Sequence, residues 1–408
     1  MAAARAGLPV LDFGEPEVWR EPALTARPML EAGERAAWVP GFETVAALRW
    51  ADCSEAIADH RRLGNIGSRY FELQGWTSGA FVDWTRRNVV MVDPPTHTRL
   101  RGLVNRAFTP KRVQAMEAST AATAHRLCDE ALARGSLEFV HEWARLLPLH
   151  VIVELLGVPS VDTDRMGEWA AALSAAAGMP TPEARITGDD AMRAFNTWVA
   201  AQIDERRAEP RDDLLTSLID AEESGERLDA DELIAMVVQL IFAGHETTQN
   251  LLGNLLYRLL DDPAALRALR ADRSLIANAI EESLRLDPPI FFTSRIAHED
   301  VEVAGVTIPT GHLVVLLLAA ANVDPTRVED PWRFDAQRAD PRHLSFGWGI
   351  HHCLGANLAR LEGRVAVRVL LERFGSISFA TDDRADWTTF TPLRGRQRLD
   401  VLVNAGGG

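Results

Sequence analysis

Cysteine is scarce in this chain of 408 residues, which contains only Cys53, Cys128 and Cys353. Three cysteines so far apart are too few for a disulfide framework, and such usage is typical of a reducing compartment. Nothing in their spacing argues for a structural pair. We therefore expect a cytoplasmic protein in which each thiol has to be explained separately.

Long hydrophobic runs are also absent. The longest, LVVLLLAAANV at 313–323, is too short to span a bilayer. The first residues, MAAARAGLPVLDFGEPEVW, have no apolar core of signal-peptide length. We expect a soluble protein that has no membrane anchor.

Positive charge is in deficit. The chain has 43 lysines and arginines against 58 aspartates and glutamates, a net charge of −15. Nucleic-acid binding depends on basic side chains that meet phosphates, so this balance disfavours a nucleic-acid partner. Acidity otherwise indicates solubility and little more.

No repeat, low-complexity tract or long Gly/Ser or Pro linker interrupts the sequence, so we expect one domain over residues 1–408. Helical periodicity dominates from about residue 110 to 286, and Thr109-Pro110 is a typical helix start. Residues 207–226 are charged and broken by proline and glycine, which predicts a loop and a short helix. Residues 229–260 form a long segment that is apolar on nearly all sides, and such a helix should be buried.

Strand-like sequence is sparse. Residues 301–318 (VEVAGVTIPTGHLVVLLL) indicate a hairpin, and residues 396–404 (RQRLDVLVN) indicate a late strand. The predicted fold class is therefore mainly α with a minor β portion.

The third cysteine lies in an unusual loop, FGWGIHHCLG at 346–355. Gly347, Gly349 and Gly355 surround Cys353 and permit tight turns. The following segment, 354–375, has helical periodicity and ends at Gly375, a plausible cap. A thiol at a helix N-terminus is favoured as the thiolate, which is the form that binds metals.

The residues alone allow three interpretations of the role of Cys353. A lone thiol is most often a small buried hydrophobe. Zinc would need four ligands at chelating spacing, and the consecutive residues His351, His352 and Cys353 cannot easily face one ion. Haem iron needs one axial thiolate and a flat apolar slot.

The loop resembles the F-x-x-G-x-x-x-C-x-G haem-binding loop of the cytochrome P450 family, through Phe346, Gly349, Cys353 and Gly355. The resemblance implies a P450 fold with a long central helix over a buried haem b (iron protoporphyrin IX). It makes Cys353 the iron ligand. It also places Phe346, with Gly347, beside the porphyrin and makes His351 a donor to a haem propionate.

Distant segments share the resemblance. Glu282 and Arg285, in EESLR, stand one turn apart on a helix, and an E-x-x-R pair by itself is weak evidence. Its position about 70 residues before the cysteine matches the family, as does the segment 321–338, which ends at Arg338. The family assigns Glu282, Arg285 and Arg338 to a buried structural charge network beneath the haem.

A second set of residues is expected to bind the haem carboxylates. In DPPTHTRLRGLVNRAFTP (93–110), His97 and Arg101 are four residues apart on one helical face. This pair suits an anion, although a solvated polar face would show the same spacing. By resemblance His97, Arg101, Arg295 and His351 neutralise the two propionates.

The motif AGHETT (243–248) interrupts the long apolar segment. Glycine and two threonines weaken a helix interior, and Glu246 is a charge amid apolar neighbours. A kink with a hydrated structural carboxylate is the alternative. By resemblance Thr247 donates a hydrogen bond where oxygen is activated, Glu246 relays protons from solvent, and the small Ala243 leaves space beside the haem.

The implied activity is that of a monooxygenase that inserts one oxygen atom from molecular oxygen into a small apolar or aromatic substrate, such as a secondary metabolite. The joint presence of Glu246 and Thr247 argues against a peroxide-only variant. No dinucleotide fingerprint or cysteine cluster supplies electrons, so a separate ferredoxin and ferredoxin reductase are implied. Arg106, Arg360 and Arg364 are candidates for their docking.

Substrate-contacting stretches follow from family position, and each of their aromatic side chains is as often core as ligand contact. The stretches are 71–83, 179–187, 238–248, 290–293 and 388–393, with Phe71, Trp76, Phe81, Phe291, Phe292 and Phe390. His245 is either a polar contact for the substrate or part of the helix packing.

Two other functions stay open at this point. A haem-binding sensor or carrier could use the same thiolate but would not need the Glu246-Thr247 pair. A haem-thiolate enzyme could also dehydrate, nitrate or couple phenols without hydroxylation. Oxygen-dependent turnover and isotopic oxygen in the product would discriminate among these functions.

Overall fold

The computed structural model describes residues 7–159, 163–178, 181–223, 228–381 and 387–405. The chain forms two compact units, each built from segments that are distant in sequence. One unit comprises residues 1–66, 250–353 and 382–399, and the other comprises 67–249, 354–381 and 400–408. In helix α14 (Ala230–Asp261), residues up to 249 belong to the second unit and residues from 250 belong to the first.

The first unit holds a five-stranded sheet of order β1-β2-β8-β5-β3. All neighbouring strands are antiparallel except β2 and β8, which run parallel. Its strands are β1 (Ala36–Val39), β2 (Thr44–Ala47), β3 (Leu63–Asn65), β5 (Thr293–Ala297) and β8 (Leu313–Leu316), and a hairpin is formed by β6 (Val301–Val303) and β7 (Val306–Ile308).

The first unit also has helices besides part of α14, and its sheet packs on a core that includes the buried Cys53. They are α2 (Pro16–Arg20), α3 (Pro22–Glu31), α4 (Trp50–Ala58), α15 (Pro263–Ala271), α16 (Ile276–Leu286) and α17 (Leu318–Ala321), with short 3₁₀ turns at Pro40–Phe42, Arg273–Leu275 and Gly349–His351.

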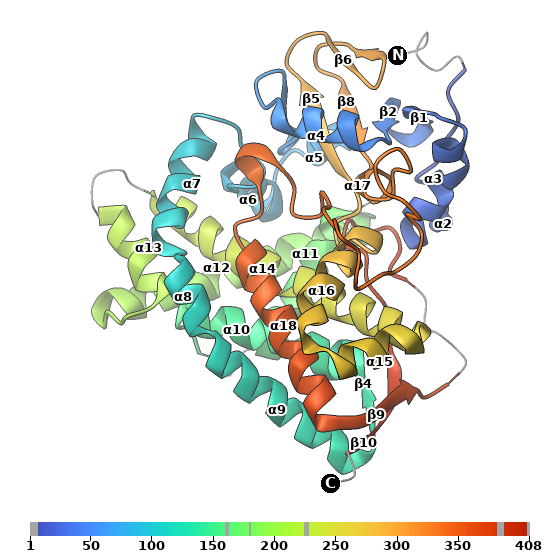
Figure 1. Ribbon diagram of the computed structural model, residues 1–408. Coiled ribbons are helices and arrows are strands. Elements are labelled where there is room, and N and C mark those ends of the chain that lie inside the picture. The colour runs from blue at the N-terminus through green and yellow to red at the C-terminus, as the bar shows by residue number, and fades with distance from the viewer. Residues whose placement is uncertain (1–6, 160–162, 179–180, 224–227, 382–386, 406–408) are drawn as a thin grey trace. The chain divides into compact units, whose positions relative to one another are not determined.

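The second unit is mostly helical, and α18 lies alongside α9 in it (Figure 1). Its helices are α5 (Arg69–Leu73), α6 (Ala80–Arg87), α7 (Thr96–Ala107), α8 (Pro110–Ala115), α9 (Glu117–Arg134), α10 (Leu146–Leu156), α11 (Thr163–Ala177), α12 (Pro182–Ala208), α13 (Leu214–Glu223) and α18 (Ala356–Arg373), with a π-helical stretch at Val140–Ala144. A sheet of order β4-β10-β9 completes it, from β4 (Ser136–Glu138), β9 (Phe374–Phe379) and β10 (Asp400–Ala405).

The mainly α class with a minor β portion is confirmed. Thr109 caps α8 as expected, since its side chain accepts a hydrogen bond from the Arg112 amide. The loop and short helix after α12 are also present: α12 ends at Ala208 and α13 begins at Leu214, while part of that segment, 224–227, lies outside the described residues.

Several sequence expectations were wrong in detail. The hairpin covers only residues 301–308, and β8 beyond it joins the five-stranded sheet instead. Gly375 does not cap α18: Phe374 follows the helix in an extended conformation, and Gly375 lies inside β9. The late strand begins at Asp400 rather than Arg396.

Strands β1 and β2 escaped prediction altogether. All eight of their residues are buried, so neither strand shows the alternation that reveals a half-exposed strand. Both also contain alanine pairs, and alanine has little strand preference. They are strands because β1 pairs with β2 and β2 pairs with β8.

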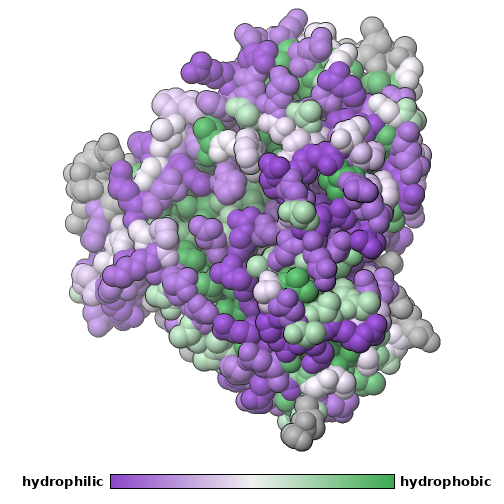
Figure 2. All heavy atoms as spheres, in the orientation of Figure 1, coloured by the Kyte–Doolittle hydropathy of each residue, from purple (hydrophilic) through white to green (hydrophobic). Residues whose placement is uncertain are grey.

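The face seen in Figure 2 is dominated by hydrophilic residues, with apolar side chains among them. Across the part of the chain that is described, no helix has the length and apolarity to cross a bilayer.

Candidate functional site

The cysteine loop, residues 346–355, contains the 3₁₀ turn Gly349–His351. Gly347 and Gly349 have φ of 68° and 69°, a left-handed conformation that disfavours side chains. The Cys353 amide donates to the Phe346 carbonyl at 2.8 Å, which closes the loop on itself. Cys353 is exposed, unlike the buried Cys53 and Cys128, and none of the three is in a disulfide. The interpretation of a cysteine as a small buried hydrophobe therefore applies to Cys53 and Cys128 and does not apply to Cys353.

Helix α18 begins later than the sequence suggested. Gly355 occupies the N-cap position and Ala356 is the first helical residue, so Cys353 precedes the cap by two residues. Gly355 has φ −81° and an ordinary backbone conformation. The expectation that the cysteine stands directly at the helix N-terminus is corrected by this spacing.

His351 and Arg295 are brought together by a residue that the sequence analysis missed. Asn65, the last residue of β3, pairs in register with Arg295 on β5. Its side-chain amide hydrogen-bonds to the His351 ring, with 2.8 Å between Asn65 Nδ2 and His351 Nε2. The end of β3 thus links two of the residues expected to bind a carboxylate. A lone asparagine 286 residues from its partner gives no sequence signal.

Arg295 is a buried arginine with a fixed side chain. Its guanidinium donates to the Thr293 hydroxyl at 3.1 Å and to the Ser294 carbonyl at 2.9 Å. Only 6% of its surface is exposed. These two hydrogen bonds fix the orientation of the guanidinium.

The second unit carries His97 and Arg101 on α7, with Pro95 at the N-cap. The two lie four residues apart within one uninterrupted helix, so they share a face as expected. His97 is buried and Arg101 half-buried. The pair therefore presents its nitrogens from a rigid element.

Thr247 and Ala243 lie one turn apart in the middle of α14. The Thr247 hydroxyl donates to the Ala243 carbonyl at 2.8 Å, the back-bond expected of a mid-helix threonine. Ala243 is exposed and Thr247 half-buried, whereas Ile241 and Thr248 on other faces are buried. This small-residue face is accessible in the middle of the helix.

Glu246 is held by a hydroxyl from another helix. Ser174 on α11 donates a short hydrogen bond to Glu246 Oε2. Burial raises the Glu246 pKa to about 7, and the Ser174 bond opposes that rise. At neutral pH the carboxyl is therefore poised between its two protonation states. Ser174 is the second residue that the sequence analysis missed, because nothing in sequence pairs it with α14.

The neighbours of Glu246 have packing roles. His245 is buried, its Nδ1 lies 3.0 Å from the Ile241 carbonyl, and burial lowers its pKa to about 4. It therefore belongs to the helix packing rather than to a substrate contact. A side chain at Gly244 would approach Ile152 of α10 to 3.0 Å, so this glycine permits close helix packing.

The expected buried charge network is present in the first unit. Arg285 donates to both Glu282 oxygens at 2.7 and 2.8 Å, and neither side chain is exposed. Arg338 donates to the same carboxylate at 2.8 Å. Arg285 also donates to the carbonyls of Asn322 and Pro331, so the network ties α16 to the loop that leads to the cysteine.

The aromatic residues expected near the substrate form two clusters. Phe71, Trp76 and Phe81 are buried and pack on one another, with ring centroids 4.9–5.7 Å apart. In the other unit Phe291 is buried against Phe292. These rings are largely core. Phe390 is the exception, because it is 39% exposed with a φ of 58°. The stretch 179–187 begins at residues outside those described.

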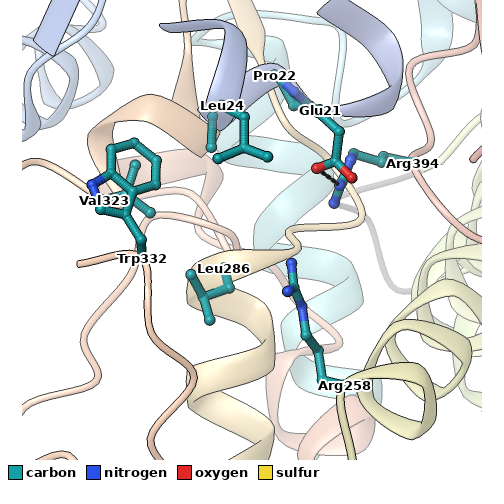
Figure 3. Close-up of a pocket in the computed structure, with 9 residues that line it drawn as sticks. Glu21, Pro22, Leu24, Arg258, Leu286, Val323, Trp332 and Arg394 are labelled. Carbon is teal, nitrogen blue, oxygen red and sulfur yellow. Dashed lines mark hydrogen bonds and ion pairs between the residues drawn. The ribbon is translucent and has the colours of Figure 1, made fainter. Parts of the chain in front are cut away.

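A small pocket in the first unit is structural. Its cavity volume is about 70 Å³, room for two or three waters rather than an organic ligand. Figure 3 shows Glu21 and Arg394 paired at its rim and Arg258 pointing toward it. Arg258 and Arg394 both bind the buried Asp287.

These residues fit a haem in their chemistry. An exposed thiol in a closed loop suits an axial iron ligand. Within the first unit, Arg295 and His351 are nitrogen donors of the kind that bind carboxylates, and within the second unit His97 and Arg101 are donors of the same kind. The accessible face at Ala243 and Thr247 has no bulky side chain that would collide with a flat ligand.

Known proteins resemble this chain over most of its length. The family model "Cytochrome P450" matches residues 147–385. Cytochrome P450 107B1 of Saccharopolyspora erythraea is 40% identical over 391 residues, covering 93% of this chain and 94% of that protein. The 6-deoxyerythronolide B hydroxylase of the same organism is 40% identical over 319 residues, 78% of each chain.

Solved structures agree. The crystal structure of CalO2 is similar with a TM-score of 0.91 at 32% identity, and covers 98% of this chain and 100% of that one. Cytochrome P450 CYP267B1, solved with myristic acid, gives a TM-score of 0.86 at 36% identity and covers 95% and 98%. The likeness therefore extends over both units.

Proposed function

The chain belongs to the cytochrome P450 family and is an oxidoreductase of the monooxygenase type, and we propose that it inserts one oxygen atom from O₂ into a small, largely apolar or aromatic organic substrate. The observation that carries this proposal is Glu246, a carboxyl held near neutral pKa inside a helix, next to Thr247. A protein that only bound haem would have no use for a poised acid there.

The cofactor in this proposal is haem b. Cys353 would ligate the iron, with Phe346, Gly347 and Gly355 forming the loop around it. When bound, the haem supplies the iron that activates O₂ for insertion into a C–H bond. By resemblance to the family, His97, Arg101, Arg295 and His351 would bind the haem carboxylates. We also expect the two units to function as one domain.

In this reaction Glu246 would relay protons, and Thr247 would position the reacting oxygen. A carboxyl with a pKa near 7 loses and regains a proton readily at neutral pH, which is the property of an efficient relay. The Thr247 hydroxyl donates to Ala243 in this structure and would turn to donate toward the reacting oxygen. The methyl group of Ala243 leaves the neighbouring space open for substrate.

The substrate class is proposed from the relatives and the side chains. One relative is named a 6-deoxyerythronolide B hydroxylase and another a polyketide biosynthesis cytochrome P450. Apolar and aromatic residues fill the stretches that would contact the substrate. We propose a hydrophobic secondary metabolite, and we expect the protein to work in the reducing cytoplasm.

Isotopic oxygen tests the reaction. The purified holoprotein, with a surrogate ferredoxin, its reductase and a panel of macrolides and aromatic compounds, should give products that carry one atom from ¹⁸O₂. Candidate substrates are first chosen by their displacement of the iron-bound water in the absorption spectrum. Products without the label would indicate phenol coupling, nitration or dehydration. No oxygen consumption with any ligand that shifts the spectrum would indicate a sensor.

The electron donor is proposed to be a ferredoxin that binds Arg106 of α7 and Arg360 and Arg364 of α18. Arg106 and Arg364 are exposed, Arg360 is half-buried, and Arg360 and Arg364 share a helical face. Basic side chains on an acidic protein would steer an acidic iron–sulfur partner. This surface lies within the second unit.

Charge reversal tests the surface. The double variant R360E/R364E should raise the KM for the ferredoxin about tenfold and leave peroxide-driven turnover unchanged. R193E, on the exposed part of α12, is the matched control and should leave both unchanged. Equal losses in ferredoxin-driven and peroxide-driven turnover would contradict this assignment.

A further inference from the structure

Among the described residues, Glu246 on α14 has one hydrogen-bonding partner, the hydroxyl of Ser174. No ion pair reaches this carboxyl within the same residues, and its pKa reflects only burial and the Ser174 bond. The adjacent His245 is turned toward the Ile241 carbonyl and is neutral near pH 7. The contact with Ser174 is therefore the one specific interaction that fixes where the carboxyl lies.

Ser174 is exceptional on its own helix. Six residues of α11 are buried, and five of them are apolar or lack a polar side chain: Met166, Gly167, Ala170, Leu173 and Ala176. Burying a hydroxyl is unfavourable unless a partner satisfies it. Ser174 is 6% exposed, and Glu246 is that partner. If packing were the only requirement, alanine would fill this position equally well. The hydroxyl therefore serves the contact with Glu246.

A hydroxyl suits this purpose better than a charged group. It donates to the carboxylate and can accept from the protonated acid, so the contact survives each change of protonation. An arginine or lysine can only donate, and would hold the carboxyl in the ionised form. Ser174 therefore keeps Glu246 in place while leaving it free to exchange its proton.

We propose that Ser174 is a positioning residue for the monooxygenase reaction: its hydroxyl holds the Glu246 carboxyl of α14 in one orientation from α11, in both protonation states. The proposal rests on the role assigned to Glu246 in the proposed function. It adds that proton delivery depends on α11 staying packed against α14, because the hydroxyl and the carboxyl come from those two helices.

Infrared spectroscopy of the resting holoprotein tests this without turnover. A wild-type minus E246Q difference spectrum identifies the carbonyl band of protonated Glu246, and its loss with rising pH gives the titration midpoint. In S174A the midpoint should rise by about one pH unit, the effect of losing one hydrogen bond to a charged group. The band itself should move to higher frequency, because the protonated carboxyl can no longer donate a hydrogen bond to the Ser174 hydroxyl.

The conservative variant and a matched control complete the test. S174T keeps the hydroxyl and should restore the midpoint and the band position. S283A removes another buried serine hydroxyl, on α16, and should leave both unchanged. The rate of oxygen consumption with a surrogate ferredoxin is then measured against pH. In S174A the pH at which this rate falls on the alkaline side should rise together with the infrared midpoint.

Two results would overturn the proposal. One is an S174A protein whose Glu246 band and midpoint match the wild type, and the other is an S174T protein that behaves like S174A. Neither result depends on oxygenation. If the infrared shift is found but no product carries label from ¹⁸O₂, the proposed reaction fails while the Ser174 contact stands.

Discussion

The side-chain amide of Asn65 lies 2.8 Å from Nε2 of His351, a residue 286 positions later in the chain. The same asparagine pairs in register with Arg295 across β3 and β5. A histidine that is to donate to a carboxylate needs a fixed ring, and Asn65 supplies the fixing contact. Under the proposed function, Asn65 would act on the cofactor through these neighbours.

Asn65→Ala should therefore loosen haem binding. We expect about tenfold faster haem loss, as for removal of one supporting hydrogen bond. Transfer of haem to excess apomyoglobin, followed by absorbance, measures this rate. Asn278→Ala, which removes a half-buried asparagine that bonds to the Ala336 and Arg338 carbonyls, is the control for a lost amide elsewhere. An unchanged rate in Asn65→Ala would show that His351 needs no such support.

Cys353→Ser should abolish the thiolate signature. The reduced, carbon-monoxide-treated wild type is expected to give the absorption spectrum of a thiolate-ligated haem, and the variant should lose it together with all turnover. Cys128→Ala removes a buried thiol whose pKa burial raises to about 12, and should keep the spectrum. An imidazole-type spectrum in the wild type would refute Cys353 as the ligand.

Glu246→Gln should slow substrate oxidation by about 100-fold, since a general acid typically contributes that much. It should also alter the pH dependence of stability. The folded pKa near 7 lies above the ordinary value of 4.5, so the stabilising contribution is complete below pH 4.5 and is lost as the pH rises through 7.

Chemical denaturation at several pH values checks the stability part. Between pH 4.5 and 7 the free energy of unfolding of the wild type should fall by about 3 kcal/mol relative to E246Q. E168Q changes an exposed glutamate of α11 and should follow the wild type. Parallel curves for wild type and E246Q would mean that the carboxyl is not desolvated.

Asp287→Asn should destabilise the first unit. Burial would raise the Asp287 pKa, but Arg258 and Arg394 outweigh burial and hold it well below its ordinary value. The variant leaves two arginines without their buried anion, a loss of about 3–5 kcal/mol. Thermal unfolding measures it, and D261N, at an exposed aspartate, is the control.

The pH dependence of the same variant has a definite sign. A depressed carboxyl pKa gives stability that is present above the ordinary pKa of 3.8 and is lost as the pH falls below it. The wild type should therefore lose more stability than D287N on acidification below about pH 4. An equal loss in both would show that the arginines do not stabilise the ionised carboxyl.

Glu282→Ala should release the loop that α16 anchors. Arg285 and Arg338 would lose their shared carboxylate, at a cost of about 3–5 kcal/mol. Limited proteolysis should then cut the segment 322–338 sooner than in the wild type. E281A removes a half-buried carboxylate paired with His343 and should have a smaller effect. Unchanged cleavage in Glu282→Ala would refute the anchoring role.

The sequence by itself determined the parts of this protein that depend on near neighbours. The long apolar run of α14, the Thr109 cap and the Glu282–Arg285 pair are set by residues within a few positions of one another, and so was the loop that identifies the family. Helical spacing also placed His97 and Arg101 on the same face of one helix. Local patterns of this kind are visible without coordinates because helix geometry fixes them.

Only the tertiary structure decided the contacts between distant segments. Strand β1 pairs with β2, and β2 pairs with the distant β8, while the uniform burial of β1 and β2 hides the alternation by which strands are recognised. Asn65 meets His351, and Ser174 meets Glu246, through packing that no spacing in the chain encodes. The physical reason is that a hydrogen bond needs two groups within about 3 Å, and folding alone brings such groups together.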